Sequence, residues 1–155
     1  MTKTTSQIKR DFFSYSDRQR SEIRRFLDSV ADDREKWINR NRYYYVLLQR
    51  LLAFHIPPEH RICHFGCDSG HLLRVLCPSK GVGVCLSEKF VRICTERFSE
   101  FKFYGEQWEE KLEGQTFDYI VLTNPGYLFD IQDILERLYR LCHHRTKVLI
   151  VNNNY

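Results

Sequence analysis

The sequence contains no long hydrophobic run, which argues against a membrane-spanning helix. Its apolar stretches, such as Tyr119–Leu122 and Val148–Val151, have the length of β-strands, whereas a membrane span needs about 20 apolar residues. The first residues, Met1–Arg10, are polar and basic without an apolar segment, so they do not resemble a secretory signal. We therefore expect a cytoplasmic protein with no membrane partner.

Disulfide and zinc motifs are also missing. None of the six cysteines forms a Cys-x-x-Cys pair, and several lie within apolar runs, where cysteine behaves as a small hydrophobic residue. Five potential metal ligands gather in one short stretch: His60, Cys63, His64, Cys67 and His71. Their spacing matches no common zinc site, and the adjacent Cys63 and His64 would point to opposite faces of a strand. We expect reduced thiols and no bound metal.

The motifs of several enzyme classes are absent as well. The sequence has no Ser-His-Asp order, no paired catalytic carboxylates and no Walker-type glycine loop. What is present is a globular composition, because the 155 residues are 43% hydrophobic and 28% charged. This length is enough for one domain with a hydrophobic core and too short for two ordinary ones.

Residues 1–56 are expected to form a helical N-terminal extension. Apolar residues recur at helical spacing over 16–30 and again over 34–54, and Pro57-Pro58 ends the second helix. The net charge of +4 comes from this third of the chain. A solvated outer surface explains the basic residues better than a nucleic-acid or membrane patch, which stays the alternative.

After Pro58 the pattern changes to strands that alternate with helices. We expect strands at 61–65, 81–86, 101–104, 117–122 and 147–151. Helices are expected over 70–76, after a Ser87 cap and after an Asp130 cap. Right-handed βαβ units of this kind build a doubly wound, mostly parallel α/β sheet. Such sheets bind ligands where their strands end, so the site is expected just after the first four strands.

The stretch Arg61–Leu73, with the sequence RICHFGCDSGHLL, carries the most information about function. An apolar strand runs into a turn that holds Gly66 and Gly70, and a helix follows. Glycine allows backbone N–H groups to approach a ligand without an intervening Cβ, and a helix N-terminus favours a carboxylate or phosphate. A tight turn uses the same residues, so the pattern alone fits either interpretation.

Order and spacing along the chain resemble the class I S-adenosylmethionine-dependent methyltransferases, from about residue 37 to residue 155. Gly66 and Gly70 match the first and third glycines of that family's motif I, acidic-x-Gly-x-Gly-x-Gly. Residues 40–45 resemble the family's lid helix, and residues 81–88 resemble its second strand. Residues 103–108 resemble the segment that borders the adenine, and residues 117–122 resemble motif IV. The resemblance implies a Rossmann-like core, residues 57–155, with the strand order 3-2-1-4-5.

The same resemblance implies S-adenosylmethionine as the cofactor and places its binding residues at the ends of the first four strands. They are His64, Gly66, Cys67, Asp68, Ser69, Gly70, Cys85, Leu86, Glu106, Gln107 and Thr123. Three of these residues depart from the family's pattern. His64 replaces the acidic residue of motif I, and Asp68 replaces the middle glycine of that motif. Cys85 replaces the acidic residue that binds the ribose hydroxyls. A thiol is a poor acceptor. Asp68 either crowds the methionine carboxylate or binds the ammonium group.

The expected sheet is shorter than the seven-stranded sheet of the family. Its fifth strand would leave an open edge, which favours association with another chain. Three explanations stay open: the chain is a fragment, or a partner such as a second copy covers the edge, or the protein is a shortened relative that lost activity.

Two functions therefore stay open. The first is methyl transfer to a small molecule, a sugar or a nucleobase, in which positioning and desolvation do most of the work and no catalytic base can be named. The second is a catalytically inactive, methyltransferase-like protein that binds a ligand or partner through the same cleft.

The segment Thr123–Tyr127, TNPGY, partly matches the Asn-Pro-Pro-Tyr of amino-group methyltransferases, although a turn before the Asp130 cap explains it better. Asp118 is expected to be structural.

Overall fold

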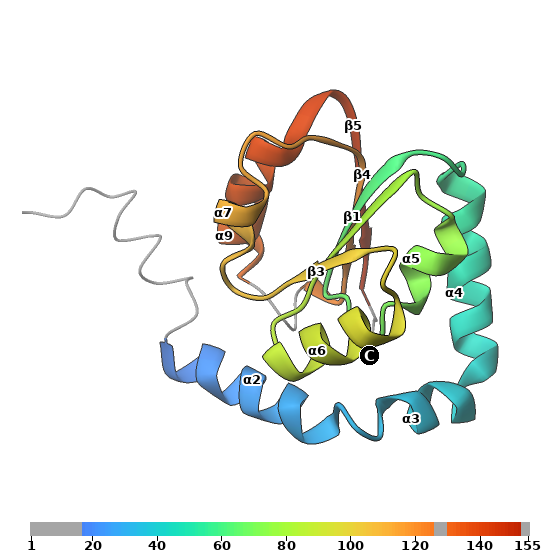
Figure 1. The fold of residues 1–155 in the computed structure, drawn as a ribbon, viewed down its shortest axis with the longest axis vertical. Helices are drawn as coiled ribbons and strands as arrows, with labels where there is room; N and C mark the ends of the chain where they lie inside the picture. The colour runs from blue at the N-terminus through green and yellow to red at the C-terminus, as the bar shows by residue number, and fades with distance from the viewer. Residues whose placement is uncertain (1–16, 126–129, 153–155) are drawn as a thin grey trace, which may run out of the picture.

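A single parallel sheet organises the chain. The computed structural model describes residues 17–125 and 130–152 and contains five strands in the order β3-β2-β1-β4-β5 (Figure 1). The strands are β1 Arg61–Phe65, β2 Lys80–Val84, β3 Lys102–Tyr104, β4 Phe117–Thr123 and β5 Cys142–Val151. All four neighbouring pairs are parallel. The predicted doubly wound sheet and its strand order are therefore confirmed.

Helices cover both faces of the sheet. One face packs against α4 Arg42–His55, α5 His71–Leu76 and α6 Glu88–Arg97. The other face packs against the short α7 Trp108–Lys111 and against α9 Ile131–Leu138. Because side chains alternate along a strand, β1 sends Ile62 into the first core and Cys63 into the second. Both faces of β1 are thus buried, as expected for the central strand of a parallel sheet.

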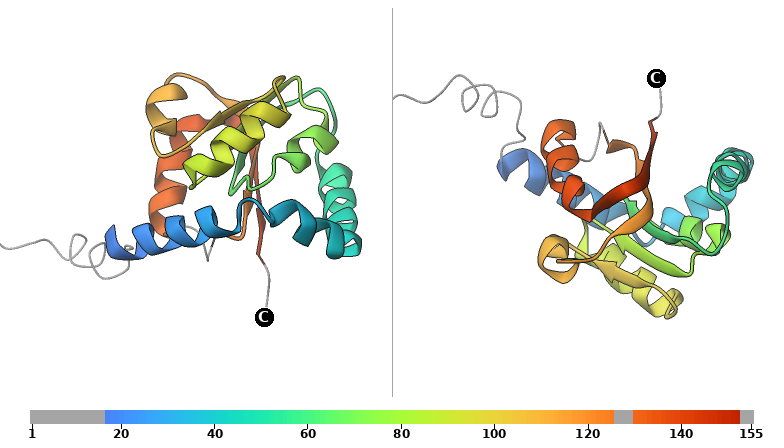
Figure 2. Two further views of the ribbon diagram at one scale, coloured as in Figure 1. Left: turned by 60° about the horizontal axis from the view of Figure 1, so that its bottom comes forward. Right: turned by 90° about the horizontal axis from the view of Figure 1, so that it is seen from above.

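The N-terminal part differs from the prediction in one respect. The first predicted helix is present as α2 Asp17–Val30, but the second is divided at Asn41 into α3 Arg34–Arg40 and α4. Asn41 has φ −102° and ψ 28°, outside the helical range, and its side chain donates a hydrogen bond to the Trp37 carbonyl. An asparagine that bonds to nearby backbone favours such a break. Helices α2 and α3 then run across the edge where the strands end (Figure 2).

Both predicted helix caps are present. The Ser87 hydroxyl accepts a hydrogen bond from the Phe90 amide at the start of α6, and the Asp130 carboxylate accepts from two amides at the start of α9. Along α9, Ile134 and Leu138 are buried, whereas Ile131 and Leu135 are more than a third exposed. None of the helices in the described parts of the chain is both long and apolar enough to cross a membrane.

Strand β5 begins at Cys142 rather than at the predicted Lys147. A register shift against β4 between Phe117 and Tyr119 accommodates the additional residues. The Thr146 hydroxyl donates to the Phe117 carbonyl at 2.6 Å and holds this irregular start. In the described sheet β5 is an edge strand, so the predicted association through that edge stays a prediction.

Candidate functional site

The glycine turn between β1 and α5 has the backbone that the sequence predicts. Gly66 and Gly70 adopt the left-handed conformation, with φ 77° and 74°. The amides of Gly66 and Cys67 both donate to the Val84 carbonyl, at 3.1 and 3.2 Å, which ties the turn to the end of β2. A Cβ on Gly70 would lie 2.8 Å from the Phe98 ring, so no larger residue fits there unless that ring moves.

Two cavities lie beside this turn, at the carboxyl ends of the strands. The larger has a volume of about 1080 Å³ and extends from the turn to the N-terminal helices. Its walls include most of the predicted methionine-side residues: His64, Gly66, Asp68, Ser69, Gly70 and Thr123. The smaller has a volume of about 100 Å³ and is lined by residues that include Cys85, Leu86, Glu106 and Trp108. The predicted site is therefore divided between two spaces.

Asp68, which stands in place of the middle glycine, forms an ion pair with an N-terminal helix. One of its oxygens accepts from the amide of Ser69 at 2.5 Å, and the other accepts from Nε of Arg34 at 2.6 Å. Arg34 also donates to the hydroxyl of Tyr45 at 2.9 Å and stacks on Trp37 with 4.5 Å from guanidinium to ring centroid. Arg34 is not predicted from the sequence, because local spacing gives no signal for a partner 34 positions away.

His64 is a buried neutral imidazole. Its side chain is 4% exposed, and Nε2 lies 3.0 Å from the Thr123 hydroxyl, which itself donates to the Gly66 carbonyl. Nε2 therefore carries the proton, and Nδ1 is an acceptor that has no hydrogen-bond partner in the described structure. Burial lowers the pKa of His64 to about 4, against a small opposing effect of Asp68. The residue cannot replace the negative charge of the family's acid at neutral pH.

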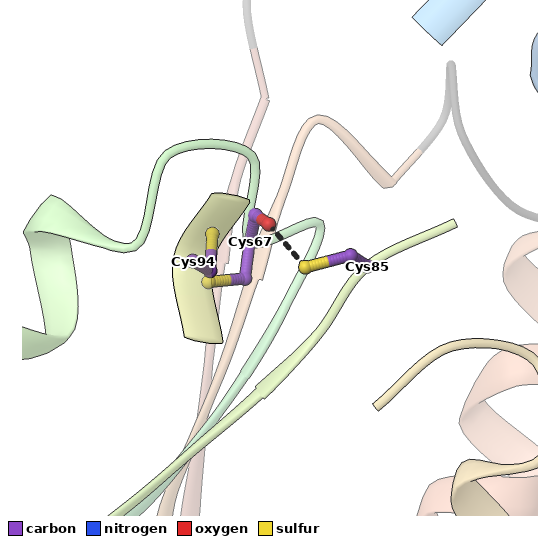
Figure 3. A group of neighbouring side chains, drawn as sticks. All are labelled: Cys67, Cys85 and Cys94. Atoms are coloured by element: carbon purple, nitrogen blue, oxygen red, sulfur yellow. Dashed lines mark hydrogen bonds between the residues drawn. The ribbon is translucent and has the colours of Figure 1, made fainter. Parts of the chain in front are cut away.

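Cys67 and Cys85 lie in the core together with a third thiol, Cys94 of α6 (Figure 3). The Cys85 thiol donates to the Cys67 carbonyl at 2.7 Å, and the Cys94 thiol donates to the Asp68 carbonyl at 3.3 Å. All three sulfurs lie within 4.8 Å of one another. The position predicted to bind ribose therefore carries a buried thiol that donates a hydrogen bond to the glycine turn.

The adenine side of the predicted site is covered by α2. Glu106 forms an ion pair with Arg24, and Lys89 forms another with Asp32, which follows α2. Gln107 is exposed and lines neither cavity, whereas the next residue, Trp108, lines the smaller one. Gln107 precedes α7, whereas Trp108 is the first residue of that helix and packs into the second core.

At the end of β4, Asn124 lines the larger cavity and has a left-handed φ of 51°. Its backbone N–H donates a hydrogen bond to the Val151 carbonyl at 2.7 Å. Gly126 and Tyr127, which complete the TNPGY segment, lie outside the described residues. Asp118 lies at the opposite end of β4 and bonds to Arg61 and His143, as a structural role requires.

The five potential ligands considered from the sequence are not gathered at one place. Among the residues that the structure describes, the group able to hold a metal is instead Cys67, Cys85 and Cys94. Only Cys67 belongs to both sets. Cys63 packs in the core on the other face of the sheet, as the alternation along β1 requires.

The fold of the chain is similar to that of solved methyltransferases. A SAM-dependent methyltransferase of Thiobacillus denitrificans, in complex with S-adenosyl-L-homocysteine, matches with TM-score 0.54 and 16% identity over 66% of this chain and 46% of that chain. The DhpI–SAH complex matches with TM-score 0.71 and 11% identity, over 90% of this chain and 72% of that chain. Magnesium protoporphyrin IX methyltransferase from Synechocystis PCC 6803, with bound SAH, matches with TM-score 0.59 and 15% identity, over 80% of this chain and 68% of that chain. The chain has the class I methyltransferase fold.

No protein-family model and no curated protein matches the sequence. The chain spans about half the length of the first of the methyltransferase structures, 46% of that chain. In a doubly wound sheet with this strand order the switch point, where ligands bind, lies between the ends of β1 and β4. The larger cavity lies at this place, and the smaller lies beside the ends of β2 and β3.

Proposed function

We propose that the protein binds S-adenosylmethionine and transfers its methyl group to a small-molecule or nucleobase acceptor. The observation that carries this proposal is the left-handed glycine turn between β1 and α5, with the larger cavity beside it and the smaller cavity beside the ends of β2 and β3. In a Rossmann-like sheet this is the place where an extended nucleoside ligand crosses from one strand end to the next.

The residues beside the larger cavity fit the methionine end of the cofactor. That end is a zwitterion, with one ammonium and one carboxylate group. Asp68 and Arg34 offer the opposite charges, and they pair with one another at 2.6 Å between Arg34 Nε and a carboxylate oxygen of Asp68. We expect Asp68 to bind the ammonium group and Arg34 the carboxylate when the ligand enters. A charge-assisted hydrogen bond of this kind contributes about 1.5–3 kcal/mol.

The residues beside the smaller cavity fit the adenosine end less well. A volume of about 100 Å³ is too small for a nucleoside, since ligand pockets are usually about 300–1000 Å³. Helix α2 therefore has to move for adenosine to enter. Its ion pairs through Arg24 and Asp32 are partly exposed, and such pairs contribute only about 0–1 kcal/mol each. These two ion pairs therefore oppose a movement of α2 only weakly.

The cofactor, when bound, supplies an activated methyl group, so the chain has only to orient the acceptor and exclude water. The larger cavity offers a suitable acceptor space, because the aromatic side chains Trp37, Tyr44 and Tyr45 line it opposite the glycine turn. Asn124, at the end of β4, offers an amide for orienting a polar acceptor. These features support a planar or apolar acceptor.

A second candidate function is ligand binding without catalysis. The observation that favours it is the loss of both family acids, since neutral His64 and buried Cys85 stand in their places. Under this alternative the cleft still binds S-adenosylmethionine or a related nucleoside, and no methyl group is transferred.

Calorimetric titration with S-adenosylmethionine and S-adenosylhomocysteine tests the proposal. The variant Asp68→Asn should weaken binding by about 10–100-fold, the value of one charge-assisted bond. The matched control is Asp118→Asn, which also removes an arginine-paired carboxylate but lies at the far end of β4. Equal binding by both variants, or no binding by the natural protein, contradicts the proposal. Binding without label transfer from methyl-labelled cofactor to any acceptor supports the second candidate.

A further inference from the structure

Three cysteine side chains meet in the core beneath the glycine turn, although they come from three separate segments. Cys67 belongs to the turn, Cys85 follows β2 and Cys94 lies in the second turn of α6 (Figure 3). Their exposed fractions are 0%, 3% and 0%. The backbone of β2 makes room for one of them, because a Cβ on Gly83 would lie 2.7 Å from the Cys67 sulfur.

From this geometry we propose that Cys67, Cys85 and Cys94 form a binding site for a thiophilic d¹⁰ metal ion, zinc(II) or copper(I). Thiolates are the ligands that these ions prefer, and three of them converge here. The site goes beyond the proposed methyl transfer and does not depend on it.

The spacing of the sulfurs fits one ion at their centre. All three lie within 4.8 Å of one another, so a point between them is no more than about 2.8 Å from each sulfur, whereas a zinc–sulfur bond is about 2.3 Å. Each sulfur has to move by about 0.5 Å or less. Small rotations about the side-chain bonds supply such a shift without moving the backbone.

The chemistry of the pocket also favours a cation. When an ion binds, each metal–sulfur bond forms from a sulfur lone pair while any remaining thiol proton leaves to solvent, and no oxidation state changes. Three thiolates in a buried pocket repel one another unless a positive charge lies between them. Binding of the ion replaces the two thiol hydrogen bonds that the carbonyls of Cys67 and Asp68 now accept.

The test uses the full chain, reduced and freed of metal, under anaerobic conditions. Zinc(II) is titrated against a chromophoric chelator and copper(I) against bicinchoninate, and the two titrations show which ion binds more tightly. We expect one ion per chain. Cys94→Ala should weaken its binding by at least about 100-fold, since loss of even an indirect metal contact costs 10–100-fold.

The matched control is Cys63→Ala, which removes another fully buried thiol from the opposite face of the sheet. It should bind the ion as the natural protein does. If Cys94→Ala does not fold, X-ray absorption on the natural protein replaces it, with three sulfur neighbours expected at about 2.3 Å. Failure of the natural protein to bind either ion, binding by Cys94→Ala at unchanged affinity, or a first shell without sulfur overturns the proposal.

Discussion

Restoring an acid at the ribose-binding position gives a direct test of the cofactor site. Cys85 follows β2, where the resemblance places a carboxylate, and it is only 3% exposed. In Cys85→Asp, two oxygens become available as acceptors for the ribose hydroxyls. One charge-assisted hydrogen bond contributes about 1.5–3 kcal/mol. If one is gained, the affinity for S-adenosylhomocysteine should therefore rise by about one to two decades.

The same substitution has a cost in the ligand-free protein. The thiol of Cys85 loses its 2.7 Å hydrogen bond to the Cys67 carbonyl, and an unpaired carboxylate is placed in the core beside the turn. We therefore expect a lower melting temperature without ligand and a larger ligand-induced increase in that temperature than in the natural protein. Ligand binding to the folded state alone produces this difference.

Calorimetric titration of metal-free protein measures the affinity, and scanning calorimetry measures the melting temperature. Cys85→Asn is the control, because it has the same shape as the aspartate without its charge. A folded Cys85→Asp protein with no gain over Cys85→Asn refutes the assignment of this position to the ribose. The cleft then serves another ligand or a partner.

Two further predictions concern stability. Burial raises the pKa of Asp118, but hydrogen bonds from the Arg61 amide and guanidinium and from His143 outweigh this effect and hold the pKa below its ordinary value. The stabilisation is therefore present above the unfolded-state pKa of about 3.9 and is lost as pH falls further. Asp118→Asn should flatten the acid side of a plot of unfolding free energy against pH, and an unchanged acid side contradicts this. Gly70→Ala should destabilise the fold more than Gly114→Ala in urea titrations. Both glycines have positive φ, 74° and 71°, but only Gly70 faces a buried ring, and equal losses would show that this contact is unimportant.

The sequence determined the features that depend on neighbouring residues. The period of apolar residues and the Ser87 and Asp130 caps were enough to predict the strands and helices of the sheet, because each signal acts within a few positions. Glycine at positions 66 and 70 predicted the turn, since a left-handed backbone is easily adopted only without a side chain. The strand order was predicted from the resemblance to the class I methyltransferases, since the right-handedness of βαβ units restricts the order without fixing it.

Only the tertiary structure decided which side chains meet at the site. Arg34 reaches Asp68 because the break at Asn41 turns the N-terminal helices along the strand ends. Cys85 and Cys94 approach the turn because α6 packs over the end of β2. Such contacts join positions tens of residues apart, and they depend on the packing angles of whole helices. Local patterns of hydrophobicity and charge do not encode those angles individually, because the packing of all the layers sets them together.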